Sequence, residues 1–128
     1  MYIHLREGSA TRNVTELCNA VTPENSHRLL FCTDDKHPMD IVAEGHINYN
    51  INLAIKQGVP PITAIQMATI NIATCYNLKQ VGAIAPGYVA DLLVFDDLKD
   101  INPKAVYING DLVAEDNHVL FETQDRKS

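Results

Sequence analysis

The sequence is poor in basic residues and lacks long apolar runs, and each shortage argues against a class of function. Its 128 residues carry 10 Lys and Arg against 16 Asp and Glu, a formal net charge of −6. Nucleic acids and acidic membranes bind basic surfaces, so neither is expected as a partner. No apolar run reaches the length of about 18 residues that predicts a membrane span. The amino-terminal stretch also lacks the shape of a signal peptide, which predicts a cytoplasmic protein.

Several chemical motifs are absent as well. The three cysteines, Cys18, Cys32 and Cys75, are widely spaced and form no CxxC pair, so we expect buried thiols and neither structural zinc nor a disulfide framework. The chain has no GxxxxGK(S/T), GxGxxG or GxSxG motif, and no HxH or HExxH that would complete a zinc site. The HxE and PCxxC signature of zinc nucleobase deaminases is also missing.

The first part of the chain alternates strand-like and helix-like segments. Residues 2–7 alternate in polarity and predict a short strand, and residues 28–33 form a continuous apolar run that is typical of a buried parallel strand. Between them, apolar residues from Val14 to Val21 recur at helical spacing after Thr11, a suitable N-cap. The order strand, helix, strand predicts a right-handed crossover unit.

The remaining sequence changes from helical to strand-like patterning. One apolar stripe at helical spacing stops at Gly58, and a second stripe predicts a helix over roughly 61–77. Residues 81–122 predict a β-meander, because Asn109-Gly110 stands between two alternating runs and is a strong hairpin signal. This shift indicates parts of two larger units rather than one closed domain.

Two adjacent carboxylates, Asp34 and Asp35, follow the second predicted strand in the sequence FCTDDKHPMD. They are either a solvated loop or part of a reaction centre. The loops at the carboxyl ends of parallel strands hold the sites of α/β proteins, and a carboxylate there is a good metal ligand and general base. Arg6 and Glu7, which end the first strand, either form a turn with a local ion pair, or one of them lies beside Asp34 at the same sheet edge. His37 and His46 are interpreted as cap or surface residues.

Three stretches of the chain resemble the bacterial-type adenine deaminases of the amidohydrolase superfamily. They are LREGSATRN (5–13), FCTDDKHPMDIVAEGHI (31–47) and MATINIATCYNLKQVGAIAPGYVADLLVFDD (67–97). The third is shared across the superfamily, whereas the first two carry the resemblance to adenine deaminase. The resemblance implies an α/β plus β fold. Residues 1–80 would form the end of a (β/α)8, TIM-type barrel, and residues 81–128 would form a segment of a β-sandwich.

The resemblance also implies an activity and a site. The family hydrolyses adenine to hypoxanthine and ammonia with a metal-activated hydroxide, and the divalent metal is expected to be Mn, with Fe or Zn as alternatives. Asp34 matches the family's catalytic proton-transfer residue and metal ligand, and Asp35 and Glu7 are candidate substrate-binding residues. Adenine is the implied small-molecule partner, and a homo-oligomer is expected.

The family's other metal ligands have no counterpart in this sequence. We therefore expect a carboxyl-terminal fragment that is inactive alone and does not bind the metal tightly, since catalytic sites take three or more protein ligands. Two alternatives stay open. One is another hydrolase of the superfamily that acts on cyclic amidines or amides. The other is a non-enzymatic module that self-associates through an exposed apolar face.

Overall fold

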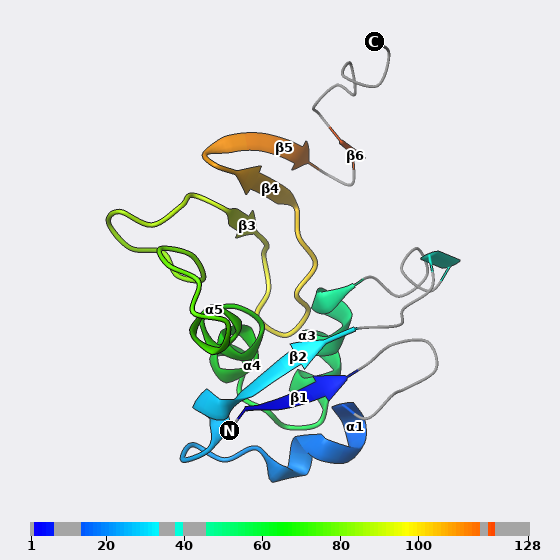
Figure 1. Ribbon diagram of the computed structural model, residues 1–128. Coiled ribbons are helices and arrows are strands. Elements are labelled where there is room, and N and C mark those ends of the chain that lie inside the picture. Colours follow the sequence, from blue (N-terminus) through cyan, green and yellow to red (C-terminus); the bar gives the residue numbers. More distant parts are fainter. Residues whose placement is uncertain (1, 7–13, 34–37, 40–45, 116–117, 120–128) are drawn as a thin grey trace.

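The computed structural model contains a two-stranded parallel sheet covered by helices and a separate four-stranded antiparallel sheet (Figure 1). It describes residues 2–6, 14–33, 38–39, 46–115 and 118–119. In chain order, its principal elements are β1 (Ile3–Arg6), α1 (Val14–Leu17), β2 (Leu29–Cys32), α3 (Ile47–Lys56), α4 (Pro61–Ala68), α5 (Ile70–Cys75), β3 (Leu92–Val94), β4 (Ala105–Ile108), β5 (Asp111–Glu115) and β6 (His118–Val119).

The two predicted amino-terminal strands pair as expected. β1 and β2 run parallel, and their register begins with Ile3 opposite Leu29 and ends with Arg6 opposite Cys32. Three consecutive β2 residues are buried, as the continuous apolar run predicts. The crossover helix is shorter than predicted, because α1 passes after one turn into a 3-10 helix, Cys18–Ala20. The order strand, helix, parallel strand is therefore confirmed.

One apolar cluster joins the parallel sheet to its helices. Leu29 and Phe31 of β2 lie on the same side of the strand, because side chains alternate between its two faces, and both belong to the cluster. The buried members are Leu5, Val14, Cys18, Leu29, Phe31, Ile51, Ala54, Val59, Ala64, Met67 and Ile101. Most come from the two strands and from α1, α3 and α4, whereas Cys18, Val59 and Ile101 lie in the 3-10 helix and in connecting segments.

The prediction of a single helix over residues 61–77 is wrong in one respect, because the structure has two helices there, α4 and α5. Backbone angles of −128° and −90° at Thr69 interrupt the chain between α4 and α5. The Thr69 hydroxyl donates a hydrogen bond to the Ile65 carbonyl at 2.7 Å, and such side-chain bonds often accompany bends. α4 begins at Pro61, where a proline costs no hydrogen bond, and the expected stop at Gly58 is confirmed by a φ of +106°.

The carboxyl-terminal strands form the predicted meander as far as Val119. They pair antiparallel in the order β3-β4-β5-β6. Asn109 and Gly110 have φ values of 52° and 84°, the sign that a tight hairpin turn of this kind requires at both central residues. The hairpin signal in the sequence is therefore confirmed.

A polar clamp connects the segment between β3 and β4 to α3. Figure 1 shows this segment running from the meander down to the helices. Asn52 accepts a hydrogen bond from the Ile101 N–H at 2.6 Å and donates to the Ile101 carbonyl at 3.2 Å. Asn48, one turn earlier on the same helix face, donates to that carbonyl at 3.3 Å. Because the Ile101 side chain is also buried in the core, the segment is held by both polar and apolar contacts.

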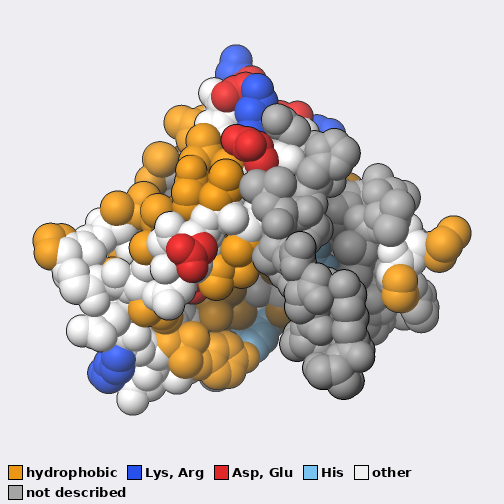
Figure 2. Space-filling model, turned by 90° about the horizontal axis from the view of Figure 1, so that it is seen from above, with side chains coloured by type: hydrophobic (Ala, Val, Ile, Leu, Met, Phe, Trp, Pro, Cys, Tyr) orange, Lys and Arg blue, Asp and Glu red, His pale blue; other side chains and the backbone are white. Residues whose placement is uncertain are grey.

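The meander carries an exposed apolar face. Leu93 pairs with Val106, and Ile108 lies two residues further along β4, so these three side chains share one side of the sheet. Leu93 and Ile108 are 52% and 53% exposed. Figure 2 shows hydrophobic side chains gathered next to one another on the side of the molecule seen from above.

Two negative findings apply to the described part of the chain alone. Its parallel sheet has two strands, which do not close a barrel. None of its helices combines the length and apolar character that a membrane crossing requires.

Candidate functional site

The carboxyl edge of the parallel sheet is the place where the sequence puts the candidate site. The last pair in the register is Arg6 opposite Cys32, so both strands end at the same edge. Glu7 directly follows Arg6, while Asp34 and Asp35 follow Cys32 after a single intervening residue. These three predicted site residues lie outside the described part of the chain. The structure therefore describes the support beneath the site rather than the carboxylates themselves.

Thr33, the residue before Asp34, contacts the start of α3. Its Oγ1 lies 3.1 Å from Nε2 of His46, which directly precedes the helix. The His46 backbone N–H donates to Oδ1 of Asn48 at 3.0 Å, so the histidine is tied to the first turn of α3. His46 is the N-cap residue of α3, as the sequence predicts, and it makes a side-chain contact that its position alone does not reveal. His37 lies outside the described residues.

A second contact from α3 reaches the residue before Thr33. Nδ2 of Asn50 donates a hydrogen bond to the Cys32 carbonyl at 3.1 Å. Because a carbonyl oxygen can only accept, this partner assigns the nitrogen and oxygen of the amide. The Asn50 side chain is fully buried, and its Oδ1 has no hydrogen-bond partner among the described residues. A buried acceptor without a donor costs about 1 to 3 kcal/mol, so this arrangement calls for a compensating role.

The opposite end of β2 is held by another buried asparagine. Nδ2 of Asn71, on α5, donates to the carbonyls of Leu29 and Ser26, both at 2.8 Å. Asn50 and Asn71 are the two buried polar side chains of the described residues. Two helices thus bind the two ends of one strand, and the end nearer to Asp34 is bound by α3.

The sequence analysis missed both asparagines, although a signal for them exists. Asn50 stands three residues after Ile47 and four before Ala54, within the buried stripe of α3. Asn71 stands four residues after Met67, on the buried side of the α4–α5 segment. A polar residue on the apolar face of a helix is expected to have a hydrogen-bond partner, because burying it without one is costly.

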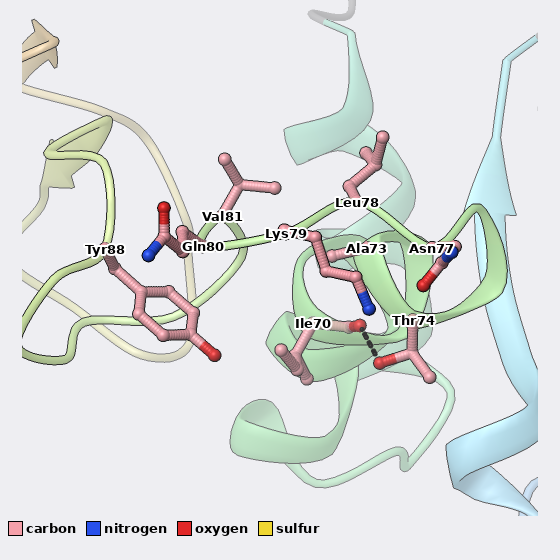
Figure 3. Close-up of a pocket in the computed structure, with 9 residues that line it drawn as sticks. All are labelled: Ile70, Ala73, Thr74, Asn77, Leu78, Lys79, Gln80, Val81 and Tyr88. Atoms are coloured by element: carbon pink, nitrogen blue, oxygen red, sulfur yellow. Dashed lines mark hydrogen bonds between the residues drawn. The ribbon is translucent and has the colours of Figure 1, made fainter.

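A cavity of about 250 Å³ lies at the end of α5. Figure 3 shows Lys79 and Tyr88 extending from the loop after α5 toward that helix, with Thr74 bonded to the Ile70 carbonyl at 2.9 Å. The cavity is lined by Ile70, Ala73, Thr74, Asn77, Leu78, Lys79, Gln80, Val81 and Tyr88. Asn71 of α5 contacts the amino end of β2, so the start of this helix lies at the opposite end of that strand from the candidate site.

The donor groups of the described residues do not gather into a metal centre. Across residues 2–6, 14–33, 38–39, 46–115 and 118–119, no three His, Cys, Asp or Glu side chains lie together as a metal site requires. Asp34 lies outside these ranges. The described residues alone do not fit a catalytic metal.

Sequence comparison relates most of the chain to one family and to curated enzymes. The model of the amidohydrolase family matches residues 8–113. An adenine deaminase of Listeria innocua is 55% identical over 115 residues, which cover 90% of this chain and 20% of that protein. An adenine deaminase of Nitratidesulfovibrio vulgaris is 46% identical over 125 residues, 98% of this chain and 22% of that protein. The chain thus spans about a fifth of the length of these relatives.

Solved structures with a related fold have low sequence identity to the chain. A β-aspartyl dipeptidase of Fervidobacterium islandicum matches with a TM-score of 0.71 and 20% identity, covering 95% of this chain and 35% of that one. An enamidase described as a member of the amidohydrolase superfamily matches with a TM-score of 0.62 and 22% identity, covering 81% of this chain and 30% of that one. At these identities the likeness concerns the fold alone.

Proposed function

The chain belongs to the amidohydrolase family, and from this premise we propose that it contributes to an enzyme that hydrolyses adenine to hypoxanthine and ammonia. The observation that carries the proposal is the 55% identity to an adenine deaminase over 90% of the chain. Because the chain spans only about a fifth of such relatives, the activity is proposed for an enzyme completed by the other parts of the fold.

The proposed place of the chain in that enzyme follows from its two sheets. The parallel pair β1–β2 with its helices would be the last part of a TIM-type barrel, over residues 1–80. The antiparallel meander would be part of a β-sandwich, over residues 81–128. The parallel register of β1 and β2 supports the first assignment, and the order β3-β4-β5-β6 supports the second.

In the proposed reaction, Asp34 carries a proton between the attacking water and the leaving nitrogen. The water oxygen forms a bond to the ring carbon that bears the amino group, and the bond from that carbon to the amino nitrogen breaks. Asp34 accepts the proton that the water releases and donates it to the departing nitrogen, which leaves as ammonia. Asp35 and Glu7 are proposed to contact the substrate. The position of Asp34 in the sequence, just after the carboxyl end of β2, supports this role.

Dependence on a divalent metal, Mn, Fe or Zn, is part of the proposal for the completed enzyme. The described residues do not fit a metal centre, so we assign no step to the metal and only one ligand, Asp34, to this chain. A single carboxylate does not hold a catalytic ion tightly. We therefore propose that the isolated chain binds the metal weakly and does not deaminate adenine.

A segment replacement tests the proposed function. The matching segment of the Listeria innocua adenine deaminase is replaced by residues of this chain, and the chimera is assayed with adenine, guanine, cytosine and cyclic amides. We expect conversion of adenine to hypoxanthine by the chimera and none by the 128-residue chain with added manganese or iron. A folded, metal-loaded chimera that acts on another substrate but not on adenine would contradict the proposed substrate. Turnover by the isolated chain would contradict its proposed inactivity.

A further inference from the structure

We propose that Asn50 is a positioning residue, which fixes the carboxyl end of β2 and thereby sets where Asp34 enters the reaction centre. The inference rests on the proposed function, because Asp34 has its role only there. Its structural basis is the hydrogen bond from Nδ2 of Asn50 to the Cys32 carbonyl, two residues before Asp34. Asn50 does not touch the substrate in this proposal; it acts through the backbone of β2.

The end of β2 is held at two successive residues. Asn50 bonds the Cys32 carbonyl at 3.1 Å, and His46 contacts Oγ1 of Thr33 at 3.1 Å. Both holding residues belong to the start of α3, which packs against β2 and the apolar core. A reaction centre needs its groups held within about 0.5 Å, and rigid elements provide this better than loops do. A helix that fixes the last two residues of the strand restricts where the next residue begins.

The burial of Asn50 distinguishes this role from ordinary helix packing. Its side chain is fully buried and lies in the stripe of α3 that also contains the buried residues Ile51 and Ala54. Leucine has nearly the same shape and would fill this place without leaving a polar atom unsatisfied. Oδ1 of Asn50 has no partner among the described residues, so core packing alone gives no reason for an amide there.

The chain itself offers a matched control. Asn71 is also a buried asparagine whose amide bonds β2, but it bonds the amino end, at Leu29. Replacing either residue by leucine removes a buried amide and its bond to the same strand. If Asn50 only stabilises the fold, both substitutions have the same effect on catalysis. If it positions Asp34, only Asn50→Leu lowers kcat.

The experiment uses the chimera described above, with Asn50→Leu and Asn71→Leu made separately. The readouts are kcat per bound metal ion, KM for adenine, and the rate of hydrogen exchange at the backbone amides of Cys32 and Thr33. For Asn50→Leu we expect kcat to fall about tenfold to a hundredfold, which is the cost of a misplaced reacting group, and exchange at both amides to speed up. KM is expected to stay within about twofold, and Asn71→Leu is expected to keep kcat within about twofold.

Each outcome decides the proposal. Equal losses of kcat in the two variants, or unchanged exchange at Cys32 and Thr33 in Asn50→Leu, would overturn it. If the unsubstituted chimera folds but is inactive, the proposed function fails, and the exchange comparison alone then decides whether Asn50 holds the strand end. If Asn50→Leu does not fold, Thr33→Val removes the second contact at a half-buried position, and an unchanged kcat there would count against positioning.

Discussion

At the scale of single residues, Asn50 and Asn71 solve the same physical problem at opposite ends of β2. A carbonyl removed from water without a donor is costly, and each asparagine donates to one from a neighbouring helix, at the half-buried Cys32 and at the buried Leu29. The solution has different consequences at the two ends. Nδ2 of Asn71 donates to two carbonyls, whereas Nδ2 of Asn50 donates to one, and the buried Oδ1 of Asn50 has no partner among the described residues. The asparagine with the unpartnered buried oxygen is the one at the end of β2 that leads to Asp34.

The first prediction concerns the stability that Asn71 provides. Asn71→Leu removes the Nδ2 group that donates to the carbonyls of Ser26 and Leu29, and the Leu29 carbonyl then lacks this donor at a buried position. We therefore expect the free energy of unfolding to fall by about 1 to 3 kcal/mol. Urea denaturation followed by circular dichroism measures it. The control is Gln66→Leu on the exposed side of α4, which should change the value by no more than about 0.5 kcal/mol. A loss for Asn71→Leu as small as the control's would show that its bonds contribute little.

The second prediction separates the two adjacent aspartates. In the chimera, Asp34→Asn should lower kcat by about a hundredfold to ten-thousandfold, because an amide cannot carry the proton. Asp35→Asn should instead raise KM more than it lowers kcat, because a substrate contact is lost while proton transfer remains. Steady-state kinetics with adenine give both constants. Near-normal kcat for Asp34→Asn would remove this residue from the mechanism, and identical effects of the two substitutions would argue against divided roles.

The sequence could indicate the carboxylates of the candidate site, but not the asparagine that holds the strand end before them. Asp34 and Asp35 stand out because charged residues directly follow an apolar run, and they stay a prediction along with Glu7. Asn50 does not stand out, because one polar residue in a helical stripe does not change the period. The partner that explains it, the Cys32 carbonyl, is 18 residues away and carries no sequence signal. Only the packing of α3 against β2 brings them together.

At the scale of elements, local signals predicted local structure well. The Asn109-Gly110 turn depends on φ values that these two residues adopt easily, so the hairpin is decided within four residues. The break at Thr69 was not predicted, because the apolar stripe continues through it from Ile65 to Ile72. Threonine at that position favours the bend through its hydroxyl, but it occurs in straight helices as well.

The third prediction concerns the packing of α5 against the following loop. Gly82 has a φ of +94°, and an added Cβ would lie 3.0 Å from the Cβ of Ala73 and 3.2 Å from the Cα of Ile70. Gly82→Ala therefore combines backbone strain of about 1 to 2 kcal/mol with overpacking of about 1 to 3 kcal/mol. Gly87→Ala is the matched control, because Gly87 has a φ of +83° and open space around its Cβ position.

Thermal unfolding of the two glycine variants measures the difference. Gly87→Ala should lose only the backbone term, and Gly82→Ala should lose clearly more stability. Equal losses would mean that the loop around Gly82 moves away from α5 without cost. That result would argue against close packing of this loop on the helix.

At the scale of the whole molecule, a buried residue joins the two sheets, and the meander exposes apolar side chains in the part of the chain that the structure describes. Ile101 links the meander to α3 by its side chain and by its backbone bonds to Asn52. Leu93 and Ile108, on β3 and β4 of the meander, are about half exposed. Contiguous apolar surface of this kind is typical of a face that packs against another part of a protein. The expected homo-oligomer would use this face in the isolated chain.

The last prediction is that the isolated chain self-associates through this meander face. Light scattering coupled to size-exclusion chromatography should give a mass above that of the monomer, 14.2 kDa. Leu93→Lys combined with Ile108→Lys should shift the chain to the monomer, because two charges would have to be buried in the contact. The control, Gln57→Lys with Gln66→Lys, adds the same charge at two exposed positions outside the meander and should leave the mass unchanged. A monomeric unsubstituted chain would rule out self-association, and an equal shift in both double variants would attribute it to net charge rather than to the apolar face.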